Sequence, residues 1–178
     1  MDDTTKLLVA NLIEALQQLQ HYIVIGLGTS VSALALTSKS VTRDHVVVSG
    51  VPVAVAPDIA CAILLAVSFL VGAMASYAAE TANLIAARLS AFPALLTAAC
   101  TFPSVATSPY IGVRALAAAL PFIFSVAAVV RVARPYRAGG RETILGGVLL
   151  FGAAYGALAL ALFRPGALAS AVADAVHH

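Results

Sequence analysis

Residues 59–79 read IACAILLAVSFLVGAMASYAA, a run without a single charged side chain. The hydrocarbon core of a bilayer is about 30 Å thick, so a spanning helix needs about 20 mostly apolar residues. This run meets that length. Three further apolar runs without a charge at their centres cover about residues 22–38, 110–130 and 144–163. The pattern predicts an all-α integral membrane protein with a bundle of four transmembrane helices.

The composition agrees with this class of protein. Hydrophobic residues make up 61% of the chain and charged residues only 10%, whereas soluble domains carry about 25% charged residues. We therefore expect residues 1–178 to form a single polytopic membrane domain that contacts the lipid bilayer. The net charge of +2 is too small to indicate nucleic acid as a partner, because such proteins carry a basic patch or stripe.

Three shorter segments lie outside the predicted spans. Residues 4–20 place leucines at helical spacing and predict an amphipathic helix, either along the interface or continuous with the first span. Residues 45–55 read HVVVSGVPVAV, and valine-rich runs around Ser-Gly predict a small β-hairpin in the first loop. Residues 92–102 are apolar but too short to span, which predicts a re-entrant or interfacial segment. Using this segment as a fifth span is the rival topology.

Small residues within the spans indicate where helices approach one another. Membrane helices associate through close packing at glycine, alanine and serine, because lipid provides no hydrophobic drive between them. The candidates are Gly72 and Ser76 in the second span, and Gly152 and Gly156 in the fourth. These residues either close the bundle within one chain or join subunits in a homo-oligomer or a larger complex.

Arginines concentrate between the third and fourth spans, and we expect them to contact lipid head groups or a partner. Because lysine and arginine are enriched in cytoplasmic loops, the first and third loops are predicted to be cytoplasmic. The expected location is an integral membrane, specifically a bacterial inner membrane. The candidate contact residues are Arg131, Arg134, Arg137 and Arg141.

The sequence contains no recognisable set of catalytic, cofactor-binding or metal-binding residues. Cys61 and Cys100 do not form a C-x-x-C motif, and the ionisable residues lie near the ends of the spans rather than at their centres. Catalysis needs a nucleophile with a base, a metal site or paired carboxylates, so we expect a protein that is not an enzyme and has no cofactor.

The remaining hypotheses concern assembly. The leading one is a self-assembling or complex-forming membrane subunit that anchors or signals to a partner. A second is an oligomeric ion channel or pore, which Thr29, Ser30 and Ser32 of the first span would line. A third is a membrane sensor component of a bacterial stress or defence system.

Overall fold

The computed structural model describes residues 3–37, 46–47, 54–55, 57–134 and 139–176. These residues contain six helices, of which four are long and apolar enough to cross a membrane. The four long helices are α1 (Asp3–Leu36), α2 (Pro57–Leu89), α4 (Ile111–Ala133) and α5 (Gly140–Phe163). The prediction of four long apolar helices is therefore confirmed.

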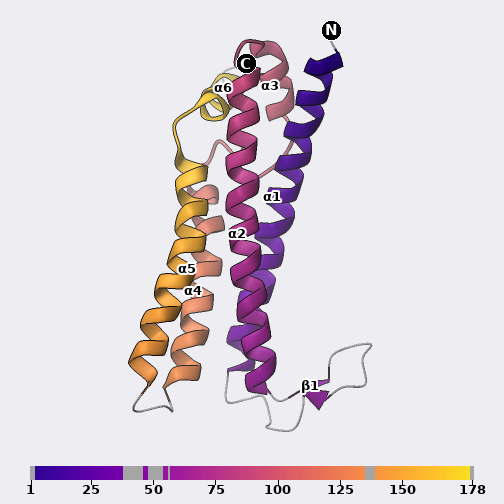
Figure 1. Cartoon of the computed structure of the whole chain (residues 1–178). Coiled ribbons are helices and arrows are strands. Elements are labelled where there is room, and N and C mark those ends of the chain that lie inside the picture. Colours follow the sequence, from indigo (N-terminus) through magenta and orange to yellow (C-terminus); the bar gives the residue numbers. More distant parts are fainter. Residues whose placement is uncertain (1–2, 38–45, 48–53, 56, 135–138, 177–178) are drawn as a thin grey trace.

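The long helices form a ring in which α1 and α5 each pack against both α2 and α4. Figure 1 shows α1 and α2 side by side along most of their length, with α4 and α5 as a second pair. Pro57 starts α2, and its missing backbone N–H is harmless at a first helical position. Pro121 lies within α4, where it is buried and the helix continues past it.

Both termini lie at the same end of the bundle (Figure 1). At this end α1 and α2 extend beyond α4 and α5, and two short helices cover them: α3 (Pro93–Cys100) and α6 (Ala167–Val176). We call this part, residues 3–20, 81–108 and 165–176, the head. Its packed side chains come from all four of these helices and include Leu12, Leu16, Leu89, Leu96, Leu168 and Val172.

The head shows how the segments outside the predicted spans are arranged. Where an amphipathic helix over residues 4–20 is predicted, the structure has the first half of α1, which continues without a break into the apolar half. Where a short apolar segment over 92–102 is predicted, it has α3, which has eight residues and is too short to cross a bilayer.

At the opposite end, two short strands pair antiparallel: β1 (Val46–Val47) and β2 (Ala54–Val55), with Val46 opposite Val55. Each strand has only two residues. The Ser49-Gly50 turn and Pro52 lie outside the described residues. The hairpin over residues 45–55 therefore stays a prediction.

Candidate functional site

Three hydroxyl groups meet in the centre of the bundle. The hydroxyls of Ser68 on α2 and Ser125 on α4 lie 3.0 Å apart, and the hydroxyl of Tyr155 on α5 lies 2.9 Å from that of Ser68. Tyr155 also donates to the backbone carbonyl of Ser68 at 2.9 Å. All three side chains are buried. We call them the hydroxyl cluster; it joins three helices by hydrogen bonds.

Two glycines make room for the tyrosine at the centre of this cluster. A Cβ atom added to Gly72 on α2 would lie 2.9 Å from Cζ of Tyr155, and one added to Gly26 on α1 would lie 3.1 Å from its hydroxyl oxygen. Tyr155 therefore fills space that two other helices leave open. Gly72, a predicted packing residue, lies at such a contact. The predicted Ser76 instead donates to the carbonyl of Ala73 on its own helix.

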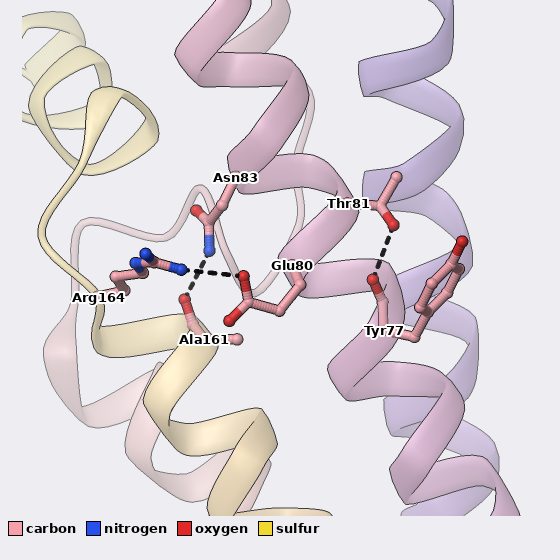
Figure 2. A network of polar contacts seen from close by, with 6 residues as sticks. All are labelled: Tyr77, Glu80, Thr81, Asn83, Ala161 and Arg164. Atoms are coloured by element: carbon pink, nitrogen blue, oxygen red, sulfur yellow. Dashed lines mark hydrogen bonds and ion pairs between the residues drawn. The ribbon is translucent and has the colours of Figure 1, made fainter.

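A second polar group of residues lies where α5 ends against α2 (Figure 2). Asn83 donates from Nδ2 to the carbonyl oxygen of Ala161 at 2.9 Å. Arg164 pairs with Glu80 at 3.2 Å, between Nη1 and Oε2. Their side chains are 62% and 44% exposed, respectively. The hydrogen bond from the side-chain amide of Asn83 fixes the end of α5 to α2. The ion pair, in contrast, is exposed to its surroundings.

Arg114, near the start of α4, reaches the same region. Its Nε donates to the carbonyl oxygen of Ser108 at 2.9 Å, and the side chain is half-buried. Arg114, Asn83 and Arg164 line one small cavity of about 10 Å³, which has room for about one water molecule. Two guanidinium groups and one carboxylate, that of Glu80, therefore gather at this level of the bundle.

An apolar groove runs between α4 and α5 on the surface of the bundle, with an open volume of about 360 Å³. Gly152 and Gly156, predicted to pack closely, line this groove. A Cβ atom added to Gly156 would meet nothing within 4 Å, and one added to Gly152 would meet only Phe122 at 4.0 Å. The other residues that line the groove are Ala115, Ala118, Ala119, Phe122, Tyr155, Ala159 and Phe163.

Of the three hydroxyls proposed to line a pore, Ser30 lies on a different side of α1 from Thr29 and Ser32, which are three residues apart. Thr29 donates to the carbonyls of Ile25 and Gly26, and Ser30 donates to that of Leu27. Ser30 is buried, Thr29 is half-buried and Ser32 is exposed. The hydroxyls of Thr29 and Ser30 therefore satisfy carbonyls of their own helix.

The predicted arginine cluster lies at the end of the bundle opposite the head. Arg131, Arg134 and Arg141 are exposed, and Arg137 lies outside the described residues. Within the described residues, no group of three His, Cys, Asp or Glu side chains could hold a metal ion. Every buried side-chain nitrogen and oxygen there has a hydrogen-bond partner.

No known protein family, no curated protein and no solved structure matches this chain.

Sequence reasoning did not single out Tyr155, Asn83 or Arg164 as members of a site. One signal for Tyr155 was present, because a tyrosine in the middle of an apolar span needs a partner for its hydroxyl. For Arg164 and Glu80, separated by 84 residues, the sequence shows only that each lies at the end of a predicted span. Their pairing depends on how α2 and α5 are placed side by side.

Proposed function

We propose that the chain is a non-catalytic multi-pass membrane subunit whose head binds a partner protein. The proposal has two parts: the placement of the four long helices in a bilayer, and the role of the head outside it. The observation that carries the second part is that the head exposes large apolar side chains at a level beyond the charged ends of the spans.

Spacing between charged residues supports the membrane placement. At 1.5 Å per residue, Asp58 and Glu80 lie about 33 Å apart along α2, and Arg141 and Arg164 about 35 Å apart along α5. These distances are close to the thickness of a hydrocarbon core, about 30 Å. Between these levels the outer surface is apolar, with exposed side chains such as Ile63, Leu70, Leu149 and Leu160.

The head lies beyond this apolar zone. Residues 3–20 of α1 alone extend about 26 Å past it along the helix axis. On the head, Leu7, Leu84 and Phe92 are 62%, 64% and 49% exposed. Outside the hydrocarbon these apolar side chains face water, and contact with another protein would remove their apolar area from water.

The opposite end offers a different kind of contact. Exposed Arg131, Arg134 and Arg141 suit anionic lipid head groups or an acidic segment of a partner. If the predicted hairpin over residues 45–55 forms, its free edge would accept an added strand from a partner. We propose that this end fixes the orientation of the chain and that the first and third loops face the cytoplasm, most simply across a bacterial inner membrane.

The channel and the sensor stay hypotheses from the sequence. The hydroxyls of Thr29 and Ser30 bond to their own helix, so no observation on the described residues favours a pore along α1. The partner that binds the head can also be a second copy of this chain, in which case the proposed subunit forms a homo-oligomer.

The test is the mass of the particle extracted from native membranes in polymer-bounded lipid discs. A monomer has a mass of 18.1 kDa; we expect a larger, discrete protein mass. Leu84→Gln should release the partner, since it places a polar side chain in an apolar contact. Asn11→Ala, at an exposed polar position of the head, is the matched control. A wild-type protein that is monomeric in such discs would contradict the proposal.

A further inference from the structure

The groove between α4 and α5 is open to the surroundings of the bundle along its length. In the membrane placement proposed above, on which this inference rests, those surroundings are lipid tails. The groove of about 360 Å³ is lined by alanine, glycine and phenylalanine and by Tyr155, whose hydroxyl is bonded to Ser68. Such a lining disfavours polar occupants, because little in it would pair with them. Lipid tails surround the groove and therefore fill it most simply.

The length of the groove matches one leaflet. Along α5 it extends from Gly152 to Phe163, about 16 Å at 1.5 Å per residue. Half of the hydrocarbon core is about 15 Å thick. The groove therefore begins near the middle of the membrane and ends where the last apolar residue of α5 is followed by Arg164. One acyl chain of the leaflet on the head side would occupy it from end to end.

A second hollow adjoins the end of the groove and shares Ala159 and Phe163 with it. Its other lining residues are Leu160, Pro165, Glu80 and Arg164, and its open volume is about 490 Å³. Both side chains of the ion pair in this hollow, Glu80 and Arg164, are exposed. The hollow thus presents a guanidinium and a carboxylate together at the depth of the lipid head groups.

This pair of charges selects among head groups. A phosphate accepts hydrogen bonds from a guanidinium, and the ethanolamine, glycerol and choline head groups all have one. The neutral glycerol of phosphatidylglycerol has no positive charge to pair with Glu80. A primary ammonium has three N–H donors for the carboxylate, whereas a quaternary ammonium has none. Arg114 does not line this hollow; it shares only the adjacent small cavity with Arg164.

We propose that this surface binds a phospholipid with a primary ammonium head group, phosphatidylethanolamine. One acyl chain lies in the groove between α4 and α5, the phosphate contacts Arg164, and the ammonium contacts the carboxylate of Glu80. No covalent step is involved. The site is a specific lipid-binding site on the side of the bundle, distinct from the arginines at the opposite end.

Native mass spectrometry of the delipidated full chain tests the proposal. The protein is titrated with phosphatidylethanolamine, phosphatidylglycerol and phosphatidylcholine that carry identical acyl chains. We expect the ethanolamine lipid to bind about tenfold more tightly than the other two, which corresponds to about 1.4 kcal/mol. Equal binding of all three lipids, or preference for the glycerol lipid, would overturn the proposal.

Variants separate the groove from the head-group contacts. Gly156→Leu places a bulky side chain in the groove, at a position where an added Cβ atom meets nothing within 4 Å, and should lower the affinity for all three lipids about tenfold. Gly28→Leu is its control, because Gly28 is also an exposed glycine of a span with nothing within 4 Å of an added Cβ. Glu80→Gln should abolish the preference for the ethanolamine lipid. Arg164→Gln should weaken the binding of all three lipids. Arg88→Gln, on the head, is the control for the loss of a positive charge elsewhere on the protein.

Two further results would count against the site. If Gly156→Leu retains full lipid affinity, the acyl chain does not use the groove. If the wild-type protein forms a dimer that Gly156→Leu dissociates, the occupant is a helix of a second copy. Thermal stability of each variant, measured in the same detergent, shows whether a lost affinity reflects a lost fold. None of these results depends on a partner at the head, so the lipid site and the proposed partner contact of the head can fail independently.

Discussion

The hydroxyl oxygen of Tyr155 lies 2.9 Å from both the hydroxyl and the backbone carbonyl oxygen of Ser68, in the centre of four apolar helices. Among lipid tails no water replaces a lost partner, so each of these groups depends on the others. The contact therefore holds α5 in one rotation and one height relative to α2. The hydroxyl of Ser125 extends the same constraint to α4.

Tyr155→Phe should destabilise the bundle because it removes only the hydroxyl and leaves Ser68 with one partner fewer. Hydrogen bonds between membrane helices average about 0.6 kcal/mol and reach about 1.7 kcal/mol, and two contacts are lost here. We expect a loss of about 1–2 kcal/mol in the free energy of unfolding, measured by denaturant titration in detergent micelles. Tyr77→Phe is the control, since Tyr77 is 71% exposed and should leave stability unchanged.

Gly72→Ala and Gly156→Ala make the same chemical change with opposite expected results. The methyl group at position 72 would lie 2.9 Å from Cζ of Tyr155, whereas at position 156 it meets nothing within 4 Å. Overpacking of this kind costs about 1–3 kcal/mol. We expect a lower melting temperature for Gly72→Ala only. Equal melting temperatures for the two variants would show that Tyr155 can move aside.

Asn83→Ala should cost more stability than Glu80→Gln, although the second variant removes a charge. Asn83 bridges α2 and α5 through a half-buried hydrogen bond, and losing it leaves the carbonyl of Ala161 with one donor fewer, at about 1 kcal/mol. Both side chains of the Glu80–Arg164 ion pair are exposed, and such exposed pairs contribute about 0–1 kcal/mol to the free energy of unfolding. The measurement is the melting temperature of each variant at low and at high salt. We expect Asn83→Ala to have the lower melting temperature at both salt concentrations.

Hydropathy located the long helices because length and apolar content are properties of each segment alone. The predicted spans at 59–79 and 144–163 lie within α2 and α5, although α2 extends ten residues further, to Leu89. That extension lies in the head, where α2 is amphipathic rather than uniformly apolar. A window tuned to the thickness of the hydrocarbon ends at Glu80, but the sequence has no helix breaker before Pro93 and so predicts one helix from about Asp58 to Ser90, close to the bounds of α2.

The contacts between helices were harder to predict, because they depend on how each helix is rotated about its axis. The spacing of Gly152 and Gly156 is the usual pattern for close packing, yet both line an open groove. A Cβ atom added to Gly26, which stands in a G-x-G sequence, would instead lie 3.1 Å from the hydroxyl oxygen of Tyr155, as expected for a small residue at a close contact. A small residue permits close approach of another helix. Whether a side chain of that helix fills the space depends on how the two helices are rotated and placed.

The side of the membrane on which each loop lies can be tested with single cysteines. Cys61 and Cys100 are buried, and burial raises the pKa of the Cys100 thiol, so neither native cysteine should react rapidly with a maleimide. Ser90 directly follows α2 at the head, and Gly139 directly precedes α5, whose first residues lie at the opposite end (Figure 1); both residues are exposed. Replacing either by cysteine thus provides a reactive thiol on one chosen side.

With the third loop cytoplasmic, a membrane-impermeant maleimide should label Ser90→Cys in intact cells and Gly139→Cys only after lysis. Combining either variant with Arg134→Glu and Arg137→Glu removes much of the positive charge that holds this loop inside. We then expect a fraction of Gly139→Cys to become labelled in intact cells. Labelling of Gly139→Cys in intact cells without the charge reversal would show that the third loop lies outside the cytoplasm. An unchanged pattern after the charge reversal would show that Arg134 and Arg137 do not set the orientation.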